Sequence, residues 1–386
     1  MHDQESKTGS GISRRDMLKF IGVAAGGAMM YQAMHTLGHA AVSPYKGPMR
    51  LEGDPKGASV LILGAGVAGM CAAYELRKAG YTVRILEYRE KAGGRCWTLR
   101  GGDTYTELGG YAQQCRFDAG QYLDPGPWRI PYHHYAVMDY CRELGVELDP
   151  FVQLNYNAYY HSPKAFGGKP QKIRHMIMDI QGHMAELLAK SDSRNGLDEE
   201  LSKEDREKLL EALKGWGGLD KDYRYAKNID TSMLRGFDTD PAGGLMPAME
   251  FSTPVGFKDL LDSNFWRFLS GSLLYEFQTP LFQPKGGMDM IAQAFASQLE
   301  GIIDFNTKVS RIDQDANGVT VTCADLKTGA EKQVKADWCL CTIPLSILSQ
   351  IEVRTGKPMK DAIDAVPYAT GFKTALQFKR RFWEED

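Results

Sequence analysis

A glycine-rich turn between an apolar run and a helical pattern is the feature that most constrains the fold of this chain. Ala58 to Leu63 (ASVLIL) is apolar and of strand length, and the helical pattern MCAAYELRKAG begins just beyond it. Between the two lie three glycines, namely Gly64, Gly66 and Gly69. A second strand pattern, Tyr81 to Leu86, leads directly to Glu87. Strand, glycine turn, helix, strand and terminal acid together are the pattern of a dinucleotide-binding βαβ unit.

Each residue of this pattern has a physical role. Gly64 permits the tight turn, Gly66 lets a pyrophosphate approach the backbone, and Gly69 lets the helix pack closely on the sheet. Amide N–H groups at the start of the helix then meet the phosphates. Glu87 stands 18 residues beyond Gly69, where its carboxylate can accept hydrogen bonds from both ribose hydroxyls. The pattern predicts an α/β fold with a doubly wound parallel sheet, and by itself it leaves the choice between NAD and FAD open.

The length and net charge of the chain limit the kinds of ligand and partner that we expect. A chain of 386 residues with 43% apolar content predicts two or three globular domains. Because 46 basic and 49 acidic side chains leave a net charge of -3 without long single-sign runs, we expect small-molecule ligands and no nucleic-acid partner. The seven cysteines show no zinc spacing and no even disulfide framework, so no metal site is predicted. Cys339 and Cys341 are interpreted as core thiols of a strand.

The first 41 residues predict an export signal that is not part of the fold. Polar residues lead into Arg14 and Arg15, and a weakly apolar run from Phe20 to Ala33 follows. This is the pattern of a twin-arginine signal. The apolar run of about 14 residues is shorter than the roughly 20 that cross a bilayer, which favours a signal peptide over a membrane anchor. We therefore expect export by the twin-arginine machinery to the periplasm or beyond.

The residues after Glu87 resemble the flavin-containing amine oxidases. Lys91 to Arg95 (KAGGR) is similar to the family's GGR segment, which brings a second glycine turn and a guanidinium to the pyrophosphate. The resemblance implies that the cofactor is FAD and that Gly94 and Arg95 contact it. It also implies that the segment around Val309 passes the adenine.

The resemblance further implies a discontinuous FAD-binding domain of Rossmann-like fold, made of residues 57–98 and 280–350. An inserted α+β substrate domain would comprise residues 99–170 and 351–386, and a helical cap residues 171–279. Helical spacing of apolar residues over 171–190 and 199–216 supports the cap. The second of these helices is expected to begin at a Ser202-x-x-Asp205 cap.

A rigid loop carries the first candidate active-site residue. Asp124 to His134 (DPGPWRIPYHH) holds Arg129 among prolines and a glycine, which restrict the backbone. GPWRIP resembles the loop of L-amino-acid oxidases in which an arginine binds the substrate carboxylate, and this implies that Arg129 is the clamp. A planar guanidinium suits a bidentate carboxylate. About 15 residues separate the family-like segment 107–110 from this loop, so Arg116 is an alternative clamp.

The second candidate lies near residue 380. In GFKTALQFKRRFW, Lys373 stands ten residues before Trp383. In the family a strand lysine at this distance from an FW pair holds a water against flavin N5, where a cation favours the negative charge that develops on dioxygen. The resemblance assigns this role to Lys373, and Lys379 is interpreted as a solvent-facing lysine.

The implied activity is oxidative deamination of L-amino acids. The substrate is oxidised to an imino acid, water releases a 2-oxo acid and ammonia, and dioxygen becomes hydrogen peroxide. No catalytic base is predicted. Two alternatives stay open: an oxidase of primary amines or polyamines, and an inactive FAD-binding fragment. The second alternative arises because the family normally continues beyond FWEED into a last flavin-binding segment, which a partner chain would then supply.

Overall fold

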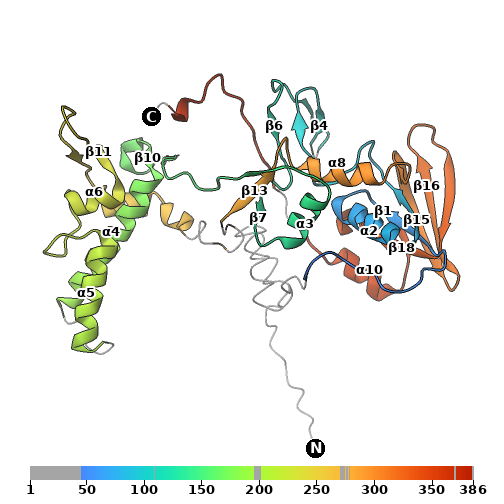
Figure 1. Ribbon diagram of the computed structural model, residues 1–386, viewed down its shortest axis with the longest axis horizontal. Helices are drawn as coiled ribbons and strands as arrows, with labels where there is room; N and C mark the ends of the chain where they lie inside the picture. Colours follow the sequence, from blue (N-terminus) through green and yellow to red (C-terminus); the bar gives the residue numbers. More distant parts are fainter. Residues whose placement is uncertain are drawn as a thin grey trace, which may run out of the picture. The chain divides into compact units, whose positions relative to one another are not determined.

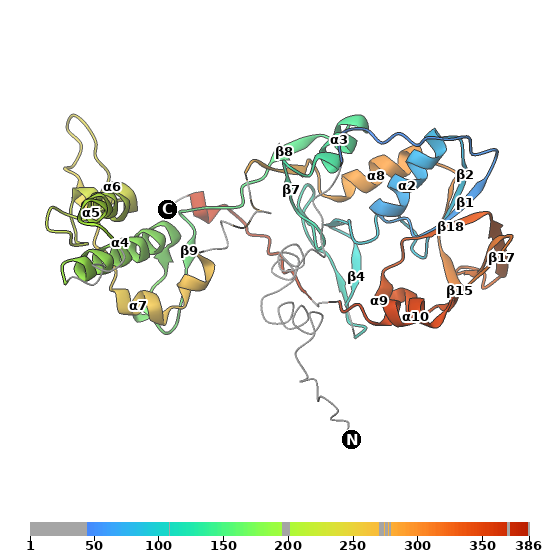
Figure 2. The same cartoon turned by 90° about the horizontal axis from the view of Figure 1, so that it is seen from below.

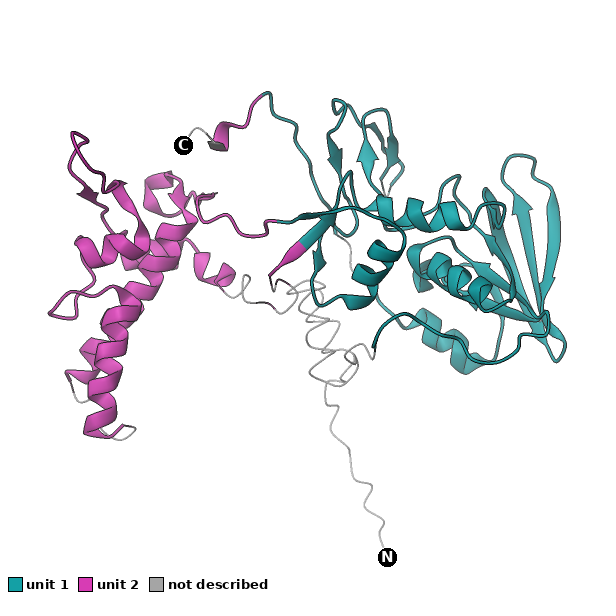
Figure 3. Ribbon diagram, in the orientation of Figure 1, with its two compact units in different colours: residues 1–151, 282–379 teal, residues 152–281, 380–386 magenta. Residues whose placement is uncertain are grey.

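The structure is a computed structural model that describes residues 45–107, 109–194, 201–269, 274, 277, 279–368 and 371–384. The predicted export signal lies outside these residues. The chain divides into two compact units, residues 1–151 with 282–379 (unit 1) and residues 152–281 with 380–386 (unit 2) (Figure 3). No helix in the described part of the chain combines the length and apolar character that a bilayer crossing requires.

A four-stranded parallel sheet lies at the centre of unit 1, in the order β14-β2-β1-β18. β1 (Ser59–Leu63) pairs with β2 (Thr82–Leu86) on one side and with β18 (Trp338–Cys341) on the other. β14 (Ile303–Asp304) pairs with the outer edge of β2. The fold is therefore mixed α/β, as predicted. Through β18 the chain returns to the first strand from far along the sequence.

Both faces of this sheet are covered. The helices α2 (Val67–Lys78), α8 (Asp289–Gln298) and α3 (Tyr135–Glu143) belong to one side, as Figures 1 and 2 show. On the other side lies a second sheet of β17 (Glu331–Ala336), β16 (Gly318–Asp325), β15 (Thr307–Asp315) and β19 (Glu352–Arg354). Successive residues of a strand face opposite sides, so Val60 and Ile62 join the first core and Leu61 and Leu63 the second.

The remaining elements of unit 1 are short. β3 (Leu99–Arg100) pairs with β6 (Tyr122–Leu123), and β4 (Thr104–Thr106) pairs with β5 (Ala112–Gln114). A third small sheet has the order β7-β13-β8, from Ile130–Pro131, Leu281–Pro284 and Leu148–Pro150. The helices α9 and α10 are Leu345–Leu348 and Lys357–Asp364.

The strand expected around Lys373 is not formed. Residues 371–378 belong to no strand, and residues 371–377 take part in no backbone-to-backbone hydrogen bond among the described residues. A strand needs a neighbour for its N–H and C=O groups, and the described chain offers none at this place.

Unit 2 is mainly helical, with α4 (Ile173–Asp192), α5 (Lys203–Gly217), α6 (Ile229–Arg235) and α7 (Phe257–Asp262). Its strands form two small hairpins, β9 (Tyr159–Tyr160) with β10 (Gln171–Lys172) and β11 (Phe237–Thr239) with β12 (Glu250–Phe251). Its 3-10 helices are η1 (Phe166–Gly168), η2 (Phe265–Phe268) and η5 (Phe382–Glu384). The predicted cap is present, because the hydroxyl of Ser202 accepts a hydrogen bond from the Asp205 amide at 3.2 Å.

The observed units differ from the three predicted domains. Residues 99–151 and 351–379 group with the segments predicted to bind FAD, whereas residues 152–170 group with the predicted helical cap. The inserted substrate domain and the separate cap stay predictions.

Candidate functional site

The glycine turn after β1 has the geometry that a phosphate-binding turn requires. Gly64 has a φ of +102°, a conformation that favours glycine, and its amide donates to the Leu86 carbonyl at 2.9 Å. A Cβ on Gly69 would overlap the carbonyl oxygen of Gly64. Gly66 is the N-cap residue of α2, and a Cβ there would meet nothing within 4 Å. Because no side chain caps α2, its first amides are left for a ligand.

The second glycine turn lies directly beside the first. The amide of Gly93 donates to the Ala65 carbonyl at 2.8 Å, and Gly66 and Gly93 form a parallel bridge. A Cβ on Gly94 would approach the Cα of Gly66 to 3.2 Å, closer than most real contacts. Arg95 is exposed at the end of this turn. The KAGGR segment therefore forms one surface with the helix N-terminus, as an elongated dinucleotide requires.

Two further predicted cofactor residues are largely buried. The Glu87 carboxylate accepts hydrogen bonds from the amides of Ala65 at 2.6 Å and Arg89 at 2.8 Å, so it also fixes the turn. The side chain of Val309 packs in the core between the two sheets, and only its backbone is left to meet a cofactor. The residues present fit a flavin dinucleotide along this edge of the sheet, with its pyrophosphate at the two glycine turns.

The loop that begins at Asp124 is anchored against this surface. Asp124 is only 8% exposed, and its Oδ1 accepts hydrogen bonds from the Thr98 hydroxyl at 2.6 Å and the Met288 amide at 3.0 Å. Burial raises the pKa of Asp124. Gly126 packs so closely that a Cβ there would overlap the carbonyl oxygen of Arg95. The loop is thus fixed both to the GGR segment and to the start of α8.

Lys373 contacts this loop close to Arg129, which is part of it. The Lys373 ammonium donates to the backbone carbonyls of Asp124, at 2.9 Å, and Gly126. Its Nζ lies 4.5 Å from the centre of the Trp128 ring, and the guanidinium carbon of Arg129 lies 5.7 Å from the same ring. Both distances are in the range of cation–π attraction. Burial lowers the pKa of Lys373 and the neighbouring Arg129 adds to this effect, whereas Asp124 opposes it.

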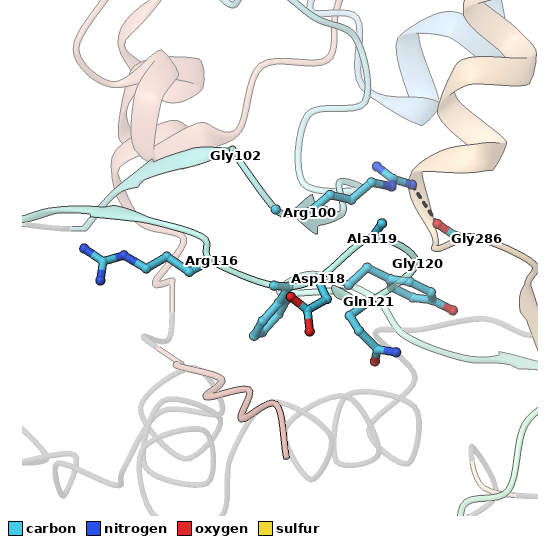
Figure 4. Close-up of a pocket in the computed structure, with 11 residues that line it drawn as sticks. Arg100, Gly102, Arg116, Asp118, Ala119, Gly120, Gln121 and Gly286 are labelled. Atoms are coloured by element: carbon cyan, nitrogen blue, oxygen red, sulfur yellow. Dashed lines mark hydrogen bonds between the residues drawn. The ribbon is translucent and has the colours of Figure 1, made fainter. Parts of the chain in front are cut away.

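Arg116 lies at a different place in unit 1. It lines a cavity of about 490 Å³ together with Arg100, Gly101, Gly102, residues 117–122 and Gly286. Figure 4 shows the Arg116 side chain extending away from Arg100, whose guanidinium bonds to Asp289 and to the Gly286 carbonyl. Arg116 is exposed. Of the two candidate clamps, Arg129 is the one that lies beside Lys373.

Sequence reasoning missed three residues of this site. The Trp128 ring lies within cation–π distance of both Arg129 and Lys373. The hydrogen bond between Thr98 and Asp124 fixes the loop. An acid at the start of a proline and glycine loop was a signal for Asp124, but nothing in the local pattern pointed to Thr98. Among the described residues, no group of three or more His, Cys, Asp or Glu side chains is placed to hold a metal ion.

The chain matches a known protein family. The family of flavin-containing amine oxidoreductases matches residues 67–386. The L-amino acid oxidase of Cerastes cerastes is 27% identical over 361 residues, covering 88% of this chain and 61% of that protein. The L-amino-acid oxidase of Protobothrops flavoviridis is 29% identical over 347 residues, covering 85% and 60%. The chain thus spans about three fifths of the length of these relatives.

Among solved structures, a putrescine oxidase is similar with a TM-score of 0.41 and 18% identity, covering 80% of this chain and 63% of that one. The family's description confirms the predicted flavin cofactor, FAD. The chain belongs to the flavin-containing amine oxidoreductases.

Proposed function

We propose that the protein catalyses the oxidative deamination of L-amino acids, with dioxygen as electron acceptor. One amino acid, one water and one dioxygen would give a 2-oxo acid, ammonia and hydrogen peroxide. The observation that carries the proposal is the convergence of Arg129 and Lys373 on the Trp128 ring, on a loop packed against the GGR segment. The names of the relatives support the same substrate class.

The residues of this chain have distinct roles in the proposal. Arg129 binds and orients the substrate carboxylate, because its planar guanidinium can donate two parallel hydrogen bonds. Lys373 supplies a positive charge held by two carbonyls, which favours negative charge on dioxygen as it is reduced. FAD bound at the two glycine turns would supply the two-electron redox chemistry between substrate and dioxygen.

We predict that Arg129→Ala lowers kcat/KM for L-phenylalanine and L-leucine by about 100-fold, since a bidentate charged contact contributes on the order of 3 kcal/mol. Turnover of phenethylamine, which lacks the carboxylate, should hardly change. Peroxide release in a coupled peroxidase assay measures both. Arg116→Ala is the matched control and is expected to stay within twofold of the wild type on every substrate.

The opposite pattern would contradict the proposal. If Arg116→Ala lost amino-acid turnover and Arg129→Ala kept it, the clamp would be Arg116. If phenethylamine or putrescine were oxidised faster than any amino acid by the wild type, the substrate class would be that of an amine or polyamine oxidase.

We also propose that polypeptide outside the described residues completes the site, as a partner chain could. β18 is an edge of its sheet, and its Trp338 is 66% exposed. Phe372 is 92% exposed, and residues 371–377 form no backbone-to-backbone hydrogen bond within the described part of the chain. Open strand edges and exposed aromatic side chains favour pairing with further chain. Flavin absorbance of the purified protein, with and without a polypeptide matching the remainder of a relative, tests this: equal absorbance would contradict it.

Export by the twin-arginine route likewise remains our proposal, supported by Arg14, Arg15 and the apolar run after them. Replacing both arginines by lysine should retain the protein in the cytoplasm. Unchanged export of that variant, measured by cell fractionation, would oppose the proposal.

A further inference from the structure

A buried carboxylate belongs to the same residue whose backbone carbonyl binds the Lys373 ammonium. We infer that Asp124 is a positioning residue for Lys373: its side chain fixes the loop that holds the ammonium group, and its negative charge balances that ammonium. The inference deepens the proposed function, and it rests on that function only for the catalytic role of Lys373.

The geometry of Asp124 supports the positioning role. Its Oδ1 accepts from Thr98 in the segment after the GGR turn and from the amide of Met288, the N-cap residue of α8. Its backbone carbonyl and that of Gly126 accept from Lys373, which is 249 residues further along the chain than Asp124. One aspartate therefore joins three distant segments at the place where the loop meets Arg95. The side chain sets the position of the carbonyls, and the carbonyls set the position of the ammonium.

The electrostatic effect of Asp124 on Lys373 depends on the charged groups around them. Lys373 interacts with Asp124, which favours its protonated form, and with Arg129, which disfavours it. Asp124 in turn faces Asp289 and Lys373, and its charge also acts on Cys96, Arg100 and Tyr122. Burial is the largest influence on Lys373 and lowers its pKa. Because burial disfavours an ammonium group, the negative charge of Asp124 opposes that effect and favours the protonated form of Lys373.

The test measures the protonation of Lys373 without any turnover. Only the neutral amine reacts with acetic anhydride, so the labelling rate of Lys373 against pH, followed by peptide mass spectrometry, reports its titration. Asp124→Asn keeps an Oδ1 acceptor for both donors but removes the charge. We predict that this variant labels Lys373 about three- to tenfold faster than the wild type at pH 8, since a tenfold change corresponds to one pKa unit.

Two further variants test the direction of the charge effect on Lys373 labelling and whether that effect is specific to Asp124. Arg129→Gln removes the repelling cation and should slow the labelling of Lys373. Asp289→Asn is the matched control, because Asp289 belongs to the same network through Thr98 but pairs with Arg100 rather than with Lys373. Its labelling should equal that of the wild type. If Asp124→Asn is not folded by circular dichroism, Thr98→Val, which removes one donor to the carboxylate, should raise the labelling rate about twofold.

The outcomes separate this inference from the proposed function. A folded Asp124→Asn protein that labels Lys373 at the wild-type rate overturns the inference, and so does an unchanged rate in Thr98→Val where that variant is needed. If labelling changes as predicted but the pH profile of peroxide release does not move, Asp124 positions Lys373 and the catalytic role of Lys373 is wrong.

Discussion

At the residue scale, Gly69 and Gly215 show how the same residue type can be required in one helix and dispensable in another. A Cβ on Gly69 would overlap the Gly64 carbonyl oxygen and press on the side chains of Thr342 and Ile62. We predict that Gly69→Ala destabilises the protein by about 1–3 kcal/mol, the usual cost of overpacking, and weakens FAD binding. Urea unfolding and flavin titration measure the two effects.

Gly215 is the control at this scale, because it lies in α5 and a Cβ there would meet nothing within 4 Å. Gly215→Ala is expected to stabilise the protein by up to about 1 kcal/mol through helix propensity alone. A Gly69→Ala variant as stable as Gly215→Ala would show that the turn and the helix can separate at low cost.

At the scale of an element, α4 is held by a buried carboxylate on its inner face. Asp179 is fully buried and accepts hydrogen bonds from Arg235 at 2.8 Å, from the Tyr225 hydroxyl at 2.7 Å and from the Val255 amide at 3.0 Å. Asp179→Ala would leave a buried guanidinium without its counter-charge, so we predict a loss of about 3–5 kcal/mol in unfolding free energy. Thermal or urea unfolding followed by circular dichroism measures it.

Helix α4 also contains a control residue for the Asp179 prediction. The exposed Lys190 pairs with the part-buried Glu186 one turn away, and ion pairs with a solvent-exposed partner contribute less than about 1 kcal/mol. Lys190→Ala should therefore leave the unfolding midpoint almost unchanged. Equal losses in the two variants would mean that the burial of the Asp179 network has no energetic importance.

At the scale of the whole molecule, every residue assigned to FAD lies in unit 1. Ligand binding stabilises the state that binds it, by about 2.7 kcal/mol at a hundredfold excess over Kd. We predict that added FAD slows amide hydrogen exchange in β1, α2 and β2 but leaves α4 and α5 of unit 2 unchanged. Peptide-level exchange mass spectrometry measures both units in one sample, and equal protection of the two would contradict the assignment.

Local patterns predicted the parts of the fold that depend on neighbouring residues. The strand, glycine turn and helix around Gly64 and the Ser202 cap all formed close to their expected places. Longer-range contacts set other boundaries: α3 begins only at Tyr135, because Pro131 lies in β7 and the chain must turn first. Within the aromatic stretch from Asn155 to Tyr160, a strand forms only at Tyr159–Tyr160, where β10 provides a partner.

The sequence by itself determined the cofactor turn and its chemistry, because glycine conformations, strand periodicity and helix termini are set by residues close together in the chain. It also proposed Arg129 and Lys373, through resemblance and without their surroundings. Only the tertiary structure decided that both residues meet at Trp128 and that Asp124 ties them to Thr98 and Met288. Hydrogen bonds between segments 26 to 249 residues apart depend on how the sheets and helices pack, and no local pattern encodes that packing.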